Sequence, residues 1–179
     1  MAHSPLGRPF PLAAAVLLAF LPSCASGNAS PSDLPSFRHA LLAGINRFRE
    51  RHDLPPLEAE PRLDAVSQEW AEHLAAIGRL QHRSGHSLSS LLAAGGWETI
   101  NENLYYSLPS PEPGKVLSDW EKSPFHRKNL LHPALQFAGL GRASATGGAT
   151  YVVLNGAGGK QRKSWEELWK SLPFRHGGE

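Results

Sequence analysis

The stretch of this chain that decides its fold reads Trp120-Glu121-Lys122-Ser123-Pro124-Phe125-His126-Arg127-Lys128-Asn129-Leu130-Leu131. Ser123 is well placed there as the N-cap of a short helix, because its hydroxyl can accept from a free backbone N–H and a proline follows it. His126 falls on that helix. Upstream lie the tripeptide Asn101-Glu102-Asn103 and, before it, His82. Two histidines and an acid spaced along one small chain make a candidate site.

Length and charge limit the class of protein. A chain of 179 residues is long enough for one domain with a substantial core and too short for two. The chain carries 18 Lys and Arg against 16 Asp and Glu, a formal net charge of +2, without a basic stripe or an acidic block. We therefore expect a single domain and no nucleic-acid partner.

Residues 1–24 have the form of an export signal, with an apolar run from Pro11 to Leu21 that is too short to span a bilayer. Cys24, the only cysteine, directly follows Leu21-Pro22-Ser23 and resembles the acylated cysteine of a bacterial lipobox. We expect an N-terminal lipid anchor on a membrane; the alternative is an ordinary leader cut near Ala25. Either interpretation predicts a protein outside the cytoplasm, in a bacterial cell envelope or secreted.

The remaining chain divides into three parts. Residues 25–35 are rich in Ser, Gly, Asn, Ala and Pro and read as a flexible tether, and residues 36–158 as the folded domain. Residues 159–179 are expected to form a C-terminal helix and tail, because Trp165, Leu168, Trp169 and Leu172 follow helical spacing. We expect this helix to pack on the domain; the alternative is that its tryptophans rest on a membrane interface or a partner.

Two amphipathic helices are predicted at the start of the domain. The first ends near His52, and the second begins at Pro61 and is closed by Gly78 and the residues after it. Their apolar residues recur at steps of three and four and are expected to form core: Leu34, Phe37, Leu41, Ile45 and Phe48, then Leu63, Val66, Trp70, Leu74 and Ile77.

His82 follows the second helix in a loop, where a polar side chain can face a cleft. His86 comes four residues later, but Gly85 and the neighbouring serines disfavour a helix, so we interpret His86 as a solvated loop residue. The segment from Thr99 to Tyr106 is predicted to be a short strand or extended arm. Glu102 lies within it between two amides, and its residues alone favour a turn with a solvated carboxylate.

The second half of the domain is predicted to contain one more long helix and a hairpin. The helix runs from about Glu112 to Lys122, with Val116, Leu117 and Trp120 facing inward. The hairpin pairs residues 136–142 with residues 150–155 across a glycine-rich turn.

Four motifs in this order resemble those of a known family. They are a histidine after the second helix, a Glu-Asn dipeptide, a tryptophan followed by Ser-Pro-x-His-Arg-x-Asn, and a terminal pair of strands with Gly-x-Gly. This pattern, from Leu41 to Gly156, is similar to the CAP superfamily (cysteine-rich secretory protein, antigen 5 and pathogenesis-related proteins) in its short bacterial, SCP-like form. The resemblance implies an α+β fold, a single-domain α-β-α sandwich with helices around a small antiparallel sheet.

The resemblance also implies a central cleft with two histidines and one or two acids. Members with a second acid usually place it a few residues past the tryptophan, whereas Glu121 directly follows Trp120 and is expected to point elsewhere on its helix. This chain also has Asn101 where the family commonly has glycine. The positions that match are His82, Glu102 and His126, and we include Asn103, Glu121 and Ser123 as further candidate cleft residues.

Two imidazoles and a carboxylate can hold a divalent cation such as zinc, transfer protons, or only bond to one another. His82, His126 and Glu102 are the predicted metal ligands. We favour a module that binds a small molecule, a lipid or a protein; the alternative is a metal-assisted, peptidase-like hydrolase. No catalytic residue is assigned, because helix capping explains Ser123 and the chain has no Gly-x-Ser-x-Gly elbow.

Overall fold

The structure is a computed structural model that describes Met1 and residues 33–159. The export signal, Cys24, most of the tether and the tail with Trp165 and Trp169 lie outside the described residues. The helices are α1 (Leu34–Glu50), α2 (Pro61–Ile77), α3 (Gly85–Gly95), α4 (Pro113–Lys122) and α5 (Pro124–Leu130). The strands are β1 (Glu58–Ala59), β2 (Thr99–Ser107), β3 (Phe137–Ser144) and β4 (Thr150–Gly158).

The strands form one sheet in the order β1-β3-β4-β2. The predicted hairpin is β3 and β4, and β2 pairs with the other side of β4; both pairings are antiparallel, as expected. β1 adds a short parallel pairing with β3, which makes the sheet mixed. A strand of two residues, Glu58 and Ala59, is too short to show an alternating pattern, so the sequence could not predict it.

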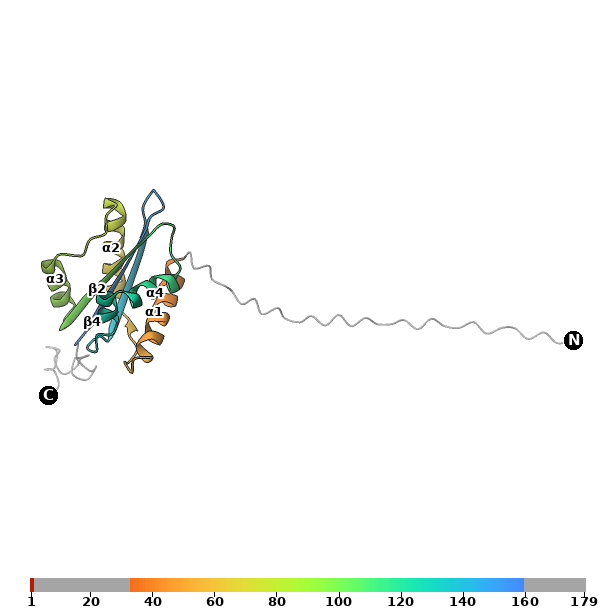
Figure 1. The fold of residues 1–179 in the computed structure, drawn as a ribbon, viewed down its shortest axis with the longest axis horizontal. Coiled ribbons are helices and arrows are strands. Elements are labelled where there is room, and N and C mark those ends of the chain that lie inside the picture. Colours follow the sequence, from red (N-terminus) through yellow and green to blue (C-terminus); the bar gives the residue numbers. More distant parts are fainter. Residues whose placement is uncertain (2–32, 160–179) are drawn as a thin grey trace, which may run out of the picture.

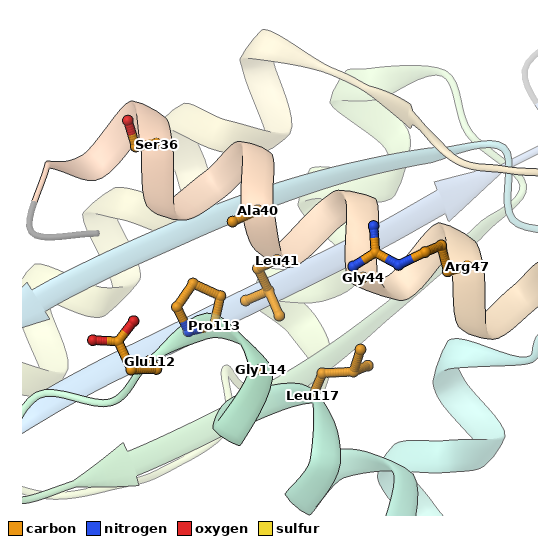
Figure 2. A pocket seen from close by; sticks show the side chains of 9 residues that line it. All are labelled: Ser36, Ala40, Leu41, Gly44, Arg47, Glu112, Pro113, Gly114 and Leu117. Carbon is orange, nitrogen blue, oxygen red and sulfur yellow. The ribbon is translucent and has the colours of Figure 1, made fainter. Parts of the chain in front are cut away.

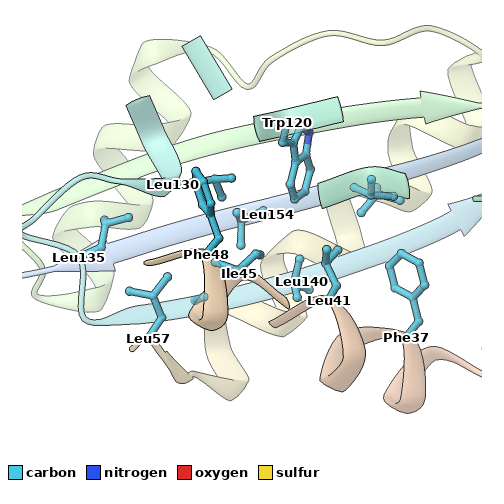
Figure 3. Packing of buried hydrophobic residues seen from close by; sticks show 13 residues of the cluster. Phe37, Leu41, Ile45, Phe48, Leu57, Trp120, Leu130, Leu135, Leu140 and Leu154 are labelled. Atoms are coloured by element: carbon cyan, nitrogen blue, oxygen red, sulfur yellow. The ribbon is translucent and has the colours of Figure 1, made fainter. Parts of the chain in front are cut away.

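Helices cover both faces of the sheet, and this gives the predicted α-β-α layers (Figure 1). Alternate residues of β4 point to opposite faces. Val152 and Leu154 pack with α1 and α4, where Figure 3 shows Trp120 close to Ile45 and Leu41. Tyr151 and Val153 pack against α2 on the other face. Four residues of the predicted stripe on α1 are buried: Phe37, Leu41, Ile45 and Phe48.

The ends of the helices follow local chemistry. The Asp33 side chain caps α1 by accepting from the backbone N–H of Ser36. α2 begins at Pro61 and ends at Gly78, which adopts the left-handed conformation that glycine favours. Both helices were predicted at these positions, and none of the helices in the described part of the chain is both long and apolar enough to cross a membrane.

α2 lies unusually close to β3 because two residues of β3 are glycines. A Cβ atom at Gly139 would lie 2.1 Å from the backbone carbonyl carbon of Leu63, and one at Gly141 would lie 2.2 Å from the backbone oxygen of Ser67. The Ser67 hydroxyl also donates to the Gly139 carbonyl at 3.1 Å. The helix backbone therefore rests directly on the sheet.

The segment after His82 differs from the prediction, because residues 85–95 form α3 and not a loop. Ser84 caps this helix by accepting from the backbone N–H of Ser87 at 3.1 Å, and Gly96 ends it in the left-handed conformation. A capping serine therefore outweighed the low helix propensity of Gly85. His86 is exposed as expected, but it lies on a helix.

Candidate functional site at the β2 edge

Glu102 is the centre of the candidate site. It lies in β2, and its side chain is only 1% exposed. Its Oε1 atom accepts from the backbone N–H of Arg83 at 3.1 Å and lies 2.8 Å from Nδ1 of His82. The interpretation of residues 101–103 as a turn with a solvated carboxylate is therefore wrong, because strand pairing with β4 fixes the glutamate in the interior.

Among the described residues, His82 has one hydrogen-bonding partner, Glu102. Since an ionised carboxylate only accepts hydrogen bonds, the contact with Glu102 places a proton on Nδ1 of His82 and leaves Nε2 available. The His82 side chain is 60% exposed. The segment before it is tied to α2, because the indole N–H of Trp70 donates to the Gln81 carbonyl at 3.2 Å. His82 thus presents one ring nitrogen to solvent from a fixed position.

Arg83 is a residue of the site that the sequence did not indicate. It is 8% exposed, it donates to the Val66 carbonyl, and its guanidinium lies 4.6 Å from the centre of the Trp70 ring. Its Nε atom is 3.8 Å from Oε2 of Glu102, and neither atom has a hydrogen-bond partner among the described residues. Burial lowers the pKa of Arg83, whereas the charges of Glu69 and Glu102 raise it. The only clue in the sequence is its place directly after His82.

His126 reaches the site from α5, which side-chain amides attach to β2. Asn103 donates to the backbone carbonyl of His126 at 3.1 Å. Asn129 donates to the Glu102 carbonyl at 3.1 Å and to the Asn103 side-chain oxygen at 2.8 Å. Asn101 donates to the Asn129 carbonyl at 3.1 Å. Asn103 therefore positions the helix that carries His126.

The protonation of His126 reflects its surroundings. Burial lowers its pKa below the usual 6.5, and the charge that His82 carries when protonated lowers it further. His82, in the loop after α2, thus influences the pKa of His126, which lies on α5. The neutral form of His126, which can accept a hydrogen bond or bind a metal, is favoured at neutral pH.

The other two predicted cleft residues do not join this group. Glu121 pairs through Oε1 with Nη2 of Arg51 at 3.2 Å, at the end of α1, as expected for a side chain that points elsewhere. Ser123 occupies the N-cap position of α5, but its side chain makes no capping hydrogen bond. The backbone carbonyl of Ser123 accepts from the backbone N–H of Arg127 instead, at 2.8 Å.

The acid of the predicted three-ligand metal site is already bonded to other groups. In residues 33–159 no three His, Cys, Asp or Glu side chains are arranged to hold a metal ion. Glu102 uses Oε1 on His82 and Arg83, and its other oxygen faces a guanidinium. A carboxylate bonded to the second nitrogen of a histidine is a common outer partner of metal sites. Nε2 of His82 and the His126 ring remain as donors.

A pocket lies elsewhere, between α1 and α4. Its volume is about 310 Å³, and Figure 2 shows Leu41 and Leu117 facing it, with Arg47 and Glu112 towards its ends. Neither histidine of the site lines it. The group around Glu102, with its exposed imidazole of His82, is therefore separate from this pocket.

Comparison with known proteins agrees with this architecture. The chain is 24% identical over 116 residues to the uncharacterized protein YkwD of Bacillus subtilis (strain 168), which covers 63% of this chain and 44% of YkwD. It is 24% identical over 132 residues to Golgi-associated plant pathogenesis-related protein 1 of Homo sapiens, over 65% of this chain and 79% of that protein. The chain therefore spans less than half the length of YkwD.

The fold itself is shared with solved structures. An outer surface protein from Borrelia burgdorferi matches with a TM-score of 0.60 at 21% identity, over 68% of this chain and 92% of that one. The model of the CAP family, described as the cysteine-rich secretory protein family, matches residues 42–155, which is more than half of the chain. This chain, with its helices on both faces of the sheet and its histidines beside β2, belongs to the CAP family.

Proposed function

We propose that this protein is an exported ligand-binding module whose binding site is the cleft at the β2 edge. His82 and His126 contact the ligand, and Glu102 orients His82. The observation that carries the proposal is the 2.8 Å contact between Nδ1 of His82 and a carboxylate that is 1% exposed. Burying a carboxylate costs free energy unless it is paired. That cost is understandable where the carboxylate fixes the orientation of an exposed imidazole.

A divalent cation such as zinc is one ligand that this donor set fits. Nε2 of His82 and a ring nitrogen of His126 would hold it, with Glu102 as the outer partner of His82. Bound zinc would supply a Lewis acid with positions open to water or to a further ligand. Because the described part of the chain supplies only two donors, we expect weaker binding than at structural zinc sites with four ligands.

Binding is favoured over hydrolysis by the position of Ser123. A nucleophilic serine needs a base within hydrogen-bond reach. Within the described residues, the Ser123 hydroxyl has no hydrogen bond to His126, whose backbone carbonyl instead accepts from Asn103. The metal-assisted hydrolase therefore remains the second candidate, to be assayed once metal binding has been measured.

We further propose that the mature protein is attached to a membrane through acylated Cys24. The lipobox-like sequence before Cys24 supports this, and the similar structures include an outer surface protein and an extracellular protein with an SCP domain from Bacillus anthracis. Mass spectrometry of the protein extracted from membranes should find an acyl group on Cys24. A mature N-terminus downstream of Cys24 would show that the anchor is absent.

The proposed site is tested by zinc titration calorimetry on the mature chain with Cys24→Ser, which removes the acylation site. We expect binding that is lost in the His82→Ala plus His126→Ala double mutant. The matched control is His39→Ala plus His86→Ala, because both histidines are exposed and neither contacts Glu102. Equal binding by both double mutants would exclude the cleft. No binding by the parent chain would exclude zinc and direct the search to lipids and proteins.

A further inference from the structure

We propose that the C-terminal segment from Trp165 to Leu172 docks into an apolar groove between α2 and α3 of the same chain. Its occupant is thus a part of this protein and not a separate ligand. The proposal concerns a surface lined by neither of the two histidines, so it does not depend on the proposed function.

The groove is small and apolar. It has a volume of about 100 Å³ and is lined by Val66 of α2, by Leu91 and Ala94 of α3, and by Trp97. A Cβ atom at Gly95 would lie 2.0 Å from the Trp97 ring, so the absence of a side chain at Gly95 lets this ring pack against α3. Small-molecule pockets usually measure about 300–1,000 Å³. A groove of this size suits one or two inserted side chains.

The apolar side chains of α3 are not fully buried by the described residues. Its three leucines, Leu88, Leu91 and Leu92, are only partly buried, and the only buried residue of the helix is Gly95. In Figure 1, α3 lies at the margin of the domain, beyond α2. Helices with an apolar face normally cover that face with another element. The described residues leave the leucine face of α3 incompletely covered.

The chain leaves the described domain next to this groove. The backbone N–H of Glu98 donates to the Gly158 carbonyl at 2.9 Å, and a Cβ atom at Gly159 would lie 2.5 Å from the Cβ atom of Glu98. Glu98 directly follows Trp97, which forms one wall of the groove. The stretch from Gly159 to Trp165 can span up to roughly 20 Å. Trp165 is therefore within reach of the groove.

The sequence of the tail matches what the groove needs. Trp165, Leu168, Trp169 and Leu172 fall on one face if the segment is helical, with about 3.6 residues per turn. On that helix Glu166 would lie beside the apolar face, and Arg62 lines the groove. The two surfaces are thus complementary in apolar character and in charge.

Docking would also restrain the cleft. α3 begins at Gly85, two residues after Arg83, and its N-cap is Ser84. A tail packed on α3 would hold the start of this helix and, through it, the segment that carries His82 and Arg83. The docked tail would therefore restrict the movement of His82.

Cysteine cross-linking tests the contact directly, because Cys24 is the only native cysteine. In the full mature chain with Cys24→Ser, we introduce Ala94→Cys together with Leu168→Cys. The matched control combines Ala94→Cys with Glu167→Cys, which has nearly the same tether length but points away from the apolar face. We expect an intramolecular disulfide on mild oxidation for position 168 and little for position 167, because a disulfide needs Cα atoms within about 7 Å.

Hydrogen exchange gives a second readout that needs no disulfide. The double variant Trp165→Ser plus Trp169→Ser should lose amide protection in residues 85–95 and keep it in α1. Equal cross-linking at positions 167 and 168, disulfides only between two copies, or unchanged protection of residues 85–95 would each overturn the proposal. The variant Lys163→Ser plus Lys170→Ser is expected to leave protection unchanged.

Discussion

The two edges of the sheet are both closed by side chains, but in different ways. Beyond β1, the edge of β3 is covered by helix residues: Arg38 donates to the Leu140 carbonyl, Asp64 accepts from the Leu140 N–H at 2.8 Å, and Gln68 bonds to both backbone groups of Arg142. At the edge of β2, Asn129 donates to the Glu102 carbonyl and Trp120 donates to the Leu104 carbonyl at 3.0 Å. Closed edges of this kind prevent pairing with other chains.

The difference lies in where the acid is. At the β3 edge, Asp64 belongs to α2. Its carboxylate accepts from the Leu140 N–H of the strand and lies 3.8 Å from Nε of Arg38. At the β2 edge, Glu102 belongs to the strand, and its carboxylate interacts with the side chains of His82 and Arg83. At the β3 edge the acid therefore bonds to the backbone of the strand. At the β2 edge the acid bonds to His82, whose imidazole stays exposed and can bind a ligand.

The substitution expected to lower stability most at the β2 edge is Glu102→Ala. It would remove the carboxylate that lies 3.8 Å from the nearly buried Arg83, and breaking a buried ion pair costs about 3–5 kcal/mol. Urea unfolding should show this loss, with a smaller one for Glu102→Gln, which keeps an acceptor for His82. A loss below about 1 kcal/mol in the alanine variant would mean that Glu102 and Arg83 are not coupled.

The matching change at the other edge is Asp64→Ala. It would leave the Leu140 N–H without its acceptor, which costs about 1–3 kcal/mol. Because Asp64 contacts neither histidine, the zinc affinity of the cleft should not change. Calorimetry that found weaker binding would show that the two edges are not independent.

Asn129→Ala should lower stability by no more than Asp64→Ala does, but it should also affect the cleft. Asn129 contributes two side-chain hydrogen bonds to β2, each worth about 0.5–1.5 kcal/mol. Without them the helix that carries His126 is less firmly held, so zinc affinity should fall. Asn46→Ala is the control, because Asn46 bonds to Leu57 and lies outside the cleft; a similar fall in its affinity would contradict the role of Asn129.

The smallest predicted effect concerns pH. Because the pKa of His126 in the folded state lies below the usual 6.5, the unfolded state takes up more protons as the pH falls. The associated stability is complete above about pH 6.5 and is lost as the pH falls toward the lowered pKa. The midpoint of thermal unfolding, measured from about pH 7 to pH 5, should fall less in His126→Gln than in the parent. Parallel curves would refute this.

The sequence predicted much of the fold because its strongest patterns are periodic. The stripes of α1, α2 and α4 indicated three helices, and the hairpin and β2 were found from composition and turns. α3 was missed because Gly85 and Gly95 have low helix propensity, whereas the stabilising cap at Ser84 was not recognised. β1 was missed because two residues carry no pattern.

The site was only partly predictable. Family resemblance supplied His82, Glu102 and His126, whereas local composition alone favoured a solvated Glu102. Arg83 became recognisable only when β2 brought Glu102 beside it, because the two residues are far apart in sequence. The position of Glu121 on α4 directs its side chain toward Arg51, and this partner could not be predicted from the sequence. Long-range partners of charged groups were therefore the missing information.

The contact between α2 and the glycines of β3 has a mechanical consequence. Because no side chain separates the two backbones at Gly139 and Gly141, the helix cannot slide or tilt on the sheet without collision. The segment that carries His82 is bonded to α2 through Trp70, so it belongs to this stiff half of the molecule. A change in the spacing of the two imidazoles is therefore not expected from movement of α2 on the sheet.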